Sequence, residues 1–234
     1  MNQIVLGDNL DVLRRLPDGL ADLVYVDPPF NTGRTQSRTR IKTTRSENGD
    51  RTGFQGRRYE TSTLGTKRFH DKFDDYLAFL EPRLREAYRI LAPHGSFYLH
   101  VDYREVHRCE KAARGKLPTD TWWHTIVPTN GAERTGYPTQ KPLGILRRIV
   151  TASSRPGDVV LDFFAGSGTT GMAAHELGRS FILVDNNPEA LEVMASRFVD
   201  VPDTNWEGFD PTGIQGKDDQ GSLFATNTDS RDRS

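Results

Sequence analysis

Two short apolar runs that each end on an aspartate constrain the fold of this 234-residue chain most strongly. Residues 159–162 lead into the glycine-containing turn FFAGSGTT, and a predicted helix at residues 169–177 leads into residues 181–185. A strand, a glycine turn, a helix and a second strand form one unit of a parallel sheet, whose strands end at a common edge. The sequence therefore predicts an α/β fold with a mostly parallel central sheet and a ligand site at that edge.

Similar patterns continue along the rest of the chain. They predict strands at residues 4–6, 23–26, 96–100 and 122–127, and helices at residues 9–16, 73–91, 142–153 and 188–198. Residues 31–70 are rich in Gly, Thr, Ser and Arg and are predicted to form a basic, mobile loop. Residues 201–234 are acidic and are predicted to be a disordered tail, which leaves residues 1–200 as a single domain.

Charge distribution is more informative than the net charge of −1. Residues 31–68 contain ten basic and three acidic residues, which favours a polyanionic partner on one face. Cys109 is the only cysteine, so neither an internal disulfide nor a thiolate metal cluster is expected. The sequence has no leader pattern and no apolar stretch long enough to span a membrane, so the expected location is the cytoplasm.

The glycine turn favours one class of nucleotide cofactor. Gly166 and Gly168 allow a ligand to approach the backbone, and Asp185 at the next strand end can bind ribose hydroxyls. The glycine spacing does not match the dinucleotide fingerprint. Asp162 would repel a pyrophosphate, but it could pair with the ammonium of an amino acid. These residues therefore favour S-adenosylmethionine over NAD.

A second strand, at residues 23–26, ends in Asp27-Pro28-Pro29-Phe30. The lone pair of an exocyclic amine on a DNA base is delocalised into the ring. A carboxylate and a backbone carbonyl that accept its two N–H bonds would free that lone pair for methylation, and proline fixes the direction of its carbonyl. Phe30 offers an aromatic face for an extruded base. The alternative interpretation is a turn that only terminates the strand.

Together these segments resemble the β class of amino-methylating DNA methyltransferases, which act on adenine N6 or cytosine N4. In that class D-P-P-[YF] precedes F-x-G-x-G, a circularly permuted order that most RNA and protein-glutamine methyltransferases do not share. The similarity also covers Gly7-Asp8, residues 84–107 and the segment TGYPTQKP at residues 135–142. It implies a Rossmann-like methyltransferase fold and direct methyl transfer to a flipped base, with S-adenosylhomocysteine as product and no metal.

The resemblance also assigns site residues. It implies a catalytic pocket of Asp27, Pro28, Pro29 and Phe30. It implies cofactor contacts from Asp8, Thr139, Lys141, Asp162, Phe163, Ala165, Gly166, Gly168, Thr169, Asp185 and Asn186. Asp8 is expected near the cofactor adenine, and Thr139 and Lys141 near the methionine carboxylate. Asp27 favours adenine N6 as the target, because members that act on cytosine N4 more often have Ser there; cytosine N4 is the alternative.

One departure from the family concerns target recognition. Only residues 108–134 separate the segments that usually flank the recognition region, which is too short for an independent domain. Specificity would then come from a loop with Trp122 and Trp123, from a separate specificity or restriction subunit, or be relaxed. A truncated, inactive descendant of the family also fits, as does a non-catalytic subunit of a DNA modification complex.

Further expectations concern partners. The candidate contacts to double-stranded DNA are Arg34, Arg38, Arg40, Arg57, Arg58 and Trp123, with the arginines on phosphates. The resemblance implies a homodimer. His100 and Cys109 are interpreted as structural.

Overall fold

The body of the protein is a parallel sheet. The structure, a computed structural model, describes residues 2–32, 34–45, 48, 51–52, 56, 58–101, 127 and 133–214. Its six-stranded sheet has the order β6-β2-β7-β8-β1-β9. The strands are β1 (Asn2–Leu6), β2 (Ala21–Val26), β6 (Leu91–Leu99), β7 (Val159–Asp162), β8 (Ser180–Asp185) and β9 (Thr204–Glu207). Each neighbouring pair is parallel, which confirms the predicted α/β class.

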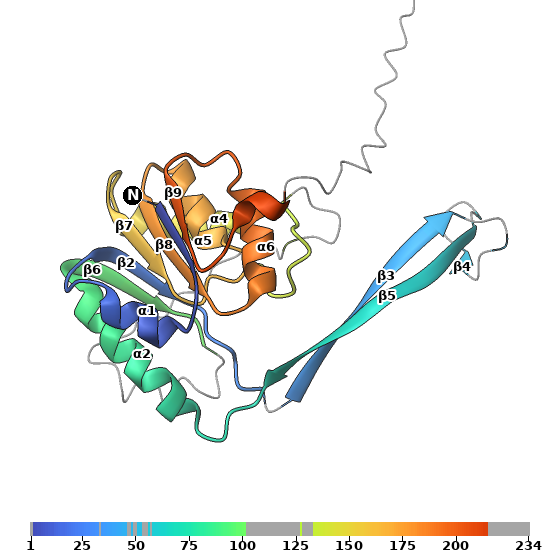
Figure 1. The fold of residues 1–234 in the computed structure, drawn as a ribbon, viewed down its shortest axis with the longest axis horizontal. Helices are drawn as coiled ribbons and strands as arrows, with labels where there is room; N and C mark the ends of the chain where they lie inside the picture. Colours follow the sequence, from blue (N-terminus) through green and yellow to red (C-terminus); the bar gives the residue numbers. More distant parts are fainter. Residues whose placement is uncertain are drawn as a thin grey trace, which may run out of the picture.

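Helices cover both faces of this sheet (Figure 1). α1 (Asn9–Arg15) and α2 (Tyr76–Ile90) lie on one face, and α4 (Leu143–Ser153), α5 (Thr169–Glu176) and α6 (Pro188–Arg197) lie on the other. Successive strand residues enter opposite cores: Ile4 packs on the α4–α6 side and Val5 on the α1–α2 side. A strand that is covered on both faces must be apolar on both sides, which is why β2, β7 and β8, in the middle of the sheet, contain short apolar runs.

Helix boundaries follow the predicted ones closely. α1, α4, α5 and α6 each lie within a residue or so of the predicted helices. α2 begins later than predicted, because Asp75 is its N-cap and accepts a hydrogen bond from the Ala78 N–H at 3.0 Å. Among the described residues, no helix is both long enough and apolar enough to cross a bilayer.

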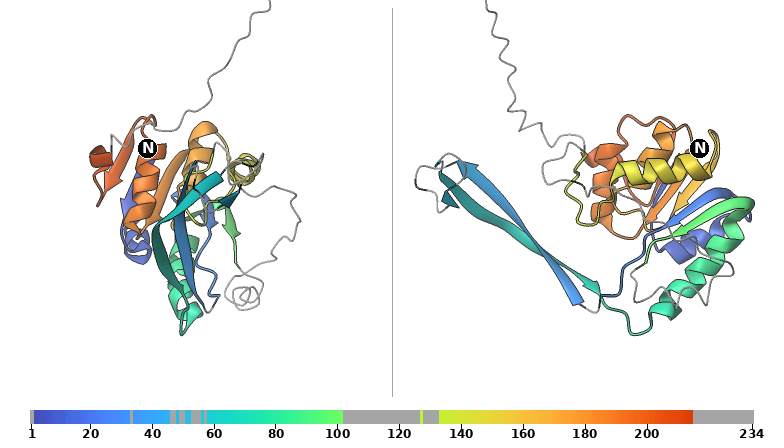
Figure 2. Two further views of the ribbon diagram at one scale, coloured as in Figure 1. Left: turned by 90° about the vertical axis from the view of Figure 1, so that its right-hand side faces the viewer. Right: turned by 180° about the vertical axis from the view of Figure 1, so that it is seen from behind.

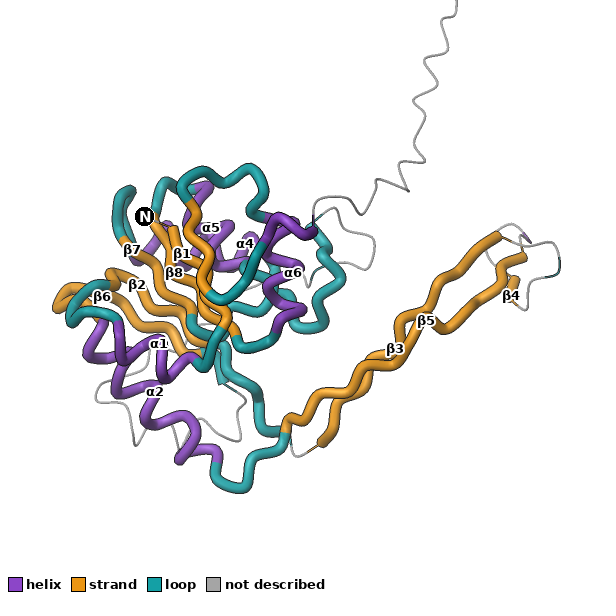
Figure 3. Tube along the Cα trace, viewed as in Figure 1, coloured by secondary structure: helices purple, strands orange, loops and turns teal. Residues whose placement is uncertain are grey.

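A long antiparallel arm replaces the loop predicted at residues 31–70. β3 (Arg34–Arg45) pairs with β5 (Arg58–Asp71) along its whole length, and β4 (Arg51–Thr52) adds a short third strand at the far end. The arm projects away from the body (Figures 1, 2 and 3). The loop prediction was wrong because it took a lack of apolar residues for a lack of structure. Threonine recurs in both strands and favours extended backbone, and a paired backbone satisfies its own polar groups.

The prediction of disorder after residue 200 was also wrong for residues 204–214. β9 lies parallel to β1, and η2 (Pro211–Ile214) follows it. Trp206 packs against the core, with its ring centroid 5.9 Å from that of Phe209, and Arg15 Nη1 donates to Glu207 at 2.7 Å. Strand pairing, the two aromatic residues and this ion pair together hold a segment whose composition is polar. Residues 215–234 lie outside the described residues, as does most of the strand predicted at residues 122–127.

Candidate active site

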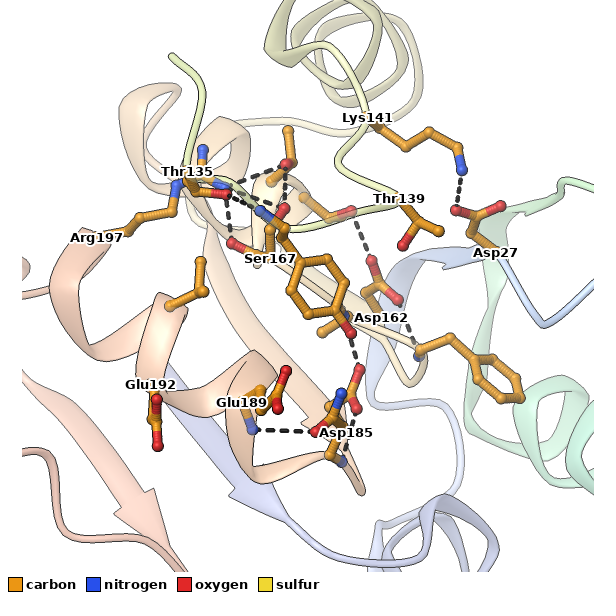
Figure 4. Close-up of a pocket in the computed structure, with 18 of the residues that line it drawn as sticks. Asp27, Thr135, Thr139, Lys141, Asp162, Ser167, Asp185, Glu189, Glu192 and Arg197 are labelled. Atoms are coloured by element: carbon orange, nitrogen blue, oxygen red, sulfur yellow. Dashed lines mark hydrogen bonds and ion pairs between the residues drawn. The ribbon is translucent and has the colours of Figure 1, made fainter. Parts of the chain in front are cut away.

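Three neighbouring strands bring an aspartate each to one edge of the sheet. Asp162 and Asp185 are the last residues of β7 and β8, and Asp27 directly follows β2. Because β2, β7 and β8 are adjacent, all three aspartates line one cavity of about 1870 Å³ (Figure 4). This is the carboxyl edge of a parallel sheet, where α/β proteins bind their ligands.

The turn between β7 and α5 depends on two glycines in left-handed backbone. The φ angles of Gly166 and Gly168 are 52° and 73°. A Cβ on Gly168 would lie 2.8 Å from Phe198 Cε2 and 2.9 Å from Met194 Cγ, and one on Gly166 would lie 3.2 Å from the Tyr137 ring. Gly168 therefore lets α6 pack directly against the turn, and Gly166 lets Tyr137 close over it.

Hydrogen bonds join this turn to its neighbours. The Gly166 N–H donates to Asp185 Oδ2 at 2.8 Å, and the Asn187 N–H donates to Asp185 Oδ1 at 2.9 Å. Arg197 Nη1 donates to the Ser167 carbonyl at 2.7 Å. Burial raises the pKa of Asp185, while these backbone N–H groups act in the opposite direction. Asp185 is therefore held in a fixed orientation at the strand end.

Asp162 is the most deeply buried carboxyl of the site, with only 2% of the residue exposed. Thr170 Oγ1 donates to its Oδ2 at 2.6 Å, and the Phe164 N–H donates to its Oδ1 at 3.0 Å. Burial raises the pKa of Asp162 to about 7, and the charges of Asp27 and Asp185 act in the same direction. A carboxyl in this state gains from a cation placed against it.

Asp27 lies between two basic side chains. Lys141 Nζ forms an ion pair with Oδ2, as Figure 4 shows, and His100 Nδ1 lies 2.9 Å from Oδ1. The His100 nitrogen is close enough for an ion pair but is not aligned for a hydrogen bond. Among the described residues, the buried Asp27 Oδ1 consequently has no hydrogen-bond donor. An amine that entered the cavity would find an acceptor there.

Phe30 contacts both basic neighbours of Asp27. Its ring packs edge-on against His100 with the centroids 5.2 Å apart, and Lys141 Nζ lies 5.3 Å from its centroid. Phe30 also lines the cavity, so it offers an aromatic surface beside Asp27.

Most residues predicted for the site meet at this cavity. Its lining includes Asp27, Pro28, Pro29, Phe30, Thr139, Lys141, Asp162, Ala165, Gly166, Thr169, Asp185 and Asn186. Gly168 shapes the turn without lining the cavity. Phe163 is fully buried and borders a second cavity of about 40 Å³, while its neighbour Phe164 lines the main one.

Asp8 lines neither of the two cavities. Its Oδ1 accepts a hydrogen bond from the Leu10 N–H at 2.8 Å as the N-cap of α1, and its Oδ2 pairs with Arg83 Nη2 at 3.1 Å. Asn9 and Arg83 instead line the small cavity beside Asp185. Asp8 therefore positions residues that border the site rather than bordering it itself.

His100 and Tyr137 belong to the surroundings of the site, although neither was selected as a site residue from the sequence. The register of β2 and β6 pairs Val26 with Leu99, so the next residues along are Asp27 and His100. Knowing that these strands are neighbours would have pointed to His100. Tyr137 lies within the segment TGYPTQKP, and burial raises its pKa to about 12.

The predicted DNA contacts lie mainly on the arm. Arg34, Arg38 and Arg40 are in β3, and Arg58 begins β5. Arg57 and Trp123 lie outside the described residues. The described part of the chain contains no group of three or more His, Cys, Asp or Glu side chains that could hold a metal ion.

A family model for N6/N4 methyltransferases, described as DNA methylase, matches residues 21–114 and 107–196, most of the chain. The chain belongs to this DNA methylase family. The resemblance to amino-methylating DNA methyltransferases is thereby confirmed. The methylase is 28% identical over 245 residues to DNA adenine methyltransferase YhdJ of Escherichia coli K12, covering 85% of this chain and 82% of that relative.

Two solved structures share the fold of this DNA methylase. One is TTHA0409 of Thermus thermophilus, a putative DNA modification methylase complexed with S-adenosyl-L-methionine; it has a TM-score of 0.53 and 20% identity, covering 90% and 100% of the two chains. The other is the cytosine-N4-specific PvuII DNA methyltransferase, with a TM-score of 0.58 and 16% identity, covering 92% and 90%. The predicted Rossmann-like methyltransferase fold is confirmed.

Proposed function

We propose that this DNA methylase transfers a methyl group from S-adenosylmethionine to N6 of a flipped adenine in double-stranded DNA. The observation that carries the proposal is the buried Asp27 Oδ1, which lacks a hydrogen-bond donor among the described residues and lies in the same cavity as Asp162 and Asp185. Asp rather than Ser at position 27 favours adenine over cytosine. The name of the relative YhdJ, a DNA adenine methyltransferase, agrees with this choice.

The cavity suits the chemistry of this cofactor. Asp162 has a raised pKa and gains from a cation, which fits the ammonium of the methionine part. Asp185, fixed by Gly166 and Asn187, presents its carboxylate to ribose hydroxyls. Ala165, Thr169, Asn186 and Thr139 complete the lining around the cofactor, and Phe163 and Gly168 support it from the core. When bound, the cofactor supplies an electrophilic methyl group.

The residues that follow β2 would act on the target base. Asp27 Oδ1 accepts one amine N–H and the backbone carbonyl of Pro28 accepts the other, which withdraws the lone pair from the ring system and aims it at the methyl group. Pro29 keeps the backbone of the segment rigid. Phe30 stacks on the extruded base. The methyl group moves directly to nitrogen without a covalent link between enzyme and base.

The arm would bind the DNA backbone. β3 alone carries Arg34, Arg38, Arg40, Lys42 and Arg45, and basic residues bind phosphates without reading sequence. A hairpin of two or three strands is marginally stable by itself, so contact with a polyanion would also stabilise the arm. We assign target choice to residues 108–134 or to a separate specificity or restriction subunit, and a homodimer is a further proposal. DNA as the substrate agrees with a cytoplasmic location.

The proposal is tested by expression in a bacterial strain that lacks DNA methyltransferases, followed by nucleoside mass spectrometry. N6-methyladenine should appear with the wild-type protein. Asp27→Ala should reduce it by about 10²- to 10³-fold, because one preorganised transition-state contact is lost. Isothermal titration should show that this variant still binds S-adenosylmethionine. Asp18→Ala is the control, because the Asp18 side chain is 80% exposed and outside the cavity lining.

Other products would contradict parts of the proposal. N4-methylcytosine without N6-methyladenine would identify cytosine as the target. Cofactor and DNA binding without any methylation would identify a non-catalytic subunit. Labelled methyl transfer to RNA but not to DNA would exclude a DNA substrate.

A further inference from the structure

We propose that His100 removes the proton that the target amine loses, taking it from Asp27 and passing it to solvent. This inference rests on the proposed function. When the methyl group moves, the nitrogen lone pair forms the new N–C bond, and the electron pair of the broken C–S bond stays on sulfur. The nitrogen then carries a positive charge and must release one proton. Asp27 Oδ1, which accepts an N–H of the amine, is the first acceptor of that proton.

Asp27 cannot easily release the proton to water. Its side chain is only 13% exposed, so bulk solvent has little access to either oxygen. Oδ2 is occupied by the ammonium group of Lys141, which has no lone pair to accept a proton. The remaining neighbour is His100 Nδ1, 2.9 Å from Oδ1. An uncharged imidazole can accept a proton at one nitrogen and release another from the opposite nitrogen.

The fold holds His100 in this position. Its backbone N–H donates to the Val26 carbonyl at 2.8 Å, which extends the β2–β6 register by one residue and places the imidazole beside Asp27. The Phe30 ring packs edge-on against it. The His100 side chain is 50% exposed, so it contacts both the enclosed Asp27 carboxylate and the solvent, and a proton can pass between them. Catalytic contacts of this kind often reach hydrogen-bond alignment only when the substrate binds.

The proposed transfer depends on pH through His100. In the described part of the chain, Lys141, from the segment before α4, forms the other ion pair of Asp27. The charge of Asp27 also raises the pKa values of Asp162 and Tyr25. A protonated imidazole cannot accept a further proton. The rate of methyl transfer should therefore fall as the pH is lowered.

The test measures single-turnover methyl transfer from labelled S-adenosylmethionine to unmethylated bacterial genomic DNA between pH 5.5 and 8.5. With S-adenosylmethionine saturating at every pH, His100→Asn should be about 10²-fold slower at pH 8, the usual contribution of a positioned proton acceptor, and should lose the acid-side decline. His100→Ala should be accelerated by free imidazole, because removal of a half-exposed ring leaves a gap that solvent can enter. Thermal melting of each variant checks that it is folded.

The chain offers a matched control on the same strand. His94, in β6, pairs through Nε2 with Asp22 Oδ1 at 2.8 Å; its side chain is 76% exposed and is not part of the cavity lining. His94→Asn should retain the wild-type rate and pH profile. A His100 variant with the wild-type rate would overturn the proposal. A slower variant that keeps the wild-type pH profile and is not rescued by imidazole would also overturn it, in favour of a purely structural role. No transfer by the wild-type protein to any DNA would overturn the proposed function, and this inference with it.

Discussion

Lys141 Nζ forms an ion pair with Asp27 Oδ2 across 114 positions of the chain. The resemblance placed Lys141 near the methionine carboxylate, whereas here it neutralises the carboxylate that would receive the target amine. Both side chains are largely enclosed, 21% and 13% exposed, so the pair is only weakly screened by solvent. Lys141 thus stabilises the charge of Asp27 at the edge of the cavity.

We expect Lys141→Gln to slow single-turnover methyl transfer by about 10- to 100-fold. A hydrogen bond to a charged group contributes roughly 1.5–3 kcal/mol, and its loss leaves Asp27 with an unpaired oxygen. Arg147→Gln is the control, since Arg147 pairs with Glu176 at the surface of α4 and α5. Equal rates for Lys141→Gln and the wild-type protein would mean that the ion pair has no role in transfer.

Cofactor affinity should depend on the protonation of Asp162. The pKa of this buried carboxyl is about 7, so it is mostly neutral at pH 6 and then offers no charge to an ammonium group. Lowering the pH from 7.5 to 6 should weaken S-adenosylmethionine binding by up to about tenfold, and binding at pH 6 should release a proton. Isothermal titration in buffers of different ionisation enthalpy measures both effects. Asp162→Asn should bind weakly at both pH values; if it kept the pH dependence, another group would be responsible.

The glycine turn permits a matched stability test. Gly168 and Gly157 both have left-handed backbone, with φ of 73° and 93°, but only Gly168 has close neighbours. Both Ala variants should lose about 1–2 kcal/mol from backbone strain. Gly168→Ala should lose roughly 1–3 kcal/mol more, because its Cβ would overlap Phe198 and Met194. Urea denaturation measures the free energy of unfolding of each variant. Equal losses would show that α6 shifts to accommodate the added Cβ without a further loss of stability.

The arm should account for much of the salt dependence of DNA binding. Arg34, Arg38 and Arg40 all belong to β3, whose backbone pairs with β5. Changing all three to Gln should weaken binding to any duplex and reduce the slope of log K against log salt by up to about 2.7, or about 0.9 for each lost phosphate contact. Fluorescence anisotropy with a labelled duplex of random sequence measures the slope. Changing Arg14, Arg85 and Arg147 to Gln removes the same charge from the body; an equal effect would indicate that only net charge matters.

Sequence and structure agree best where burial is continuous. Val24, Leu161 and Val184 lie in short apolar runs that can satisfy a sheet covered on both faces, and those strands were predicted almost to the residue. The turn glycines and the strand-end aspartates could be predicted equally well from the sequence, because each has a fixed position relative to its own strand. Asp27, Asp162 and Asp185 meet because their strands are neighbours in the sheet.

The prediction failed where structure depends on pairing or on contacts that are distant in the chain. β3 and β5 carry few apolar residues and owe their order to each other, and β9 is held by Trp206 beside a polar sequence. The proximity of His100 to Asp27 requires the order and register of β2 and β6, which no local pattern contains. Asp8 is the N-cap of α1, and its expected place near the cofactor adenine stays a prediction.

The two strands of the arm begin and end side by side. Arg34 lies opposite Asp71, and below this pair Asn31 Oδ1 accepts a hydrogen bond from the Phe73 N–H at 3.1 Å, so that the base of the arm is already closed. The arm is therefore a replaceable insertion. A short turn across its base could take its place without moving β2 or α2. Its length and charge can therefore be exchanged, by protein engineering or by natural recombination, while the strand ends that form the cavity stay where they are.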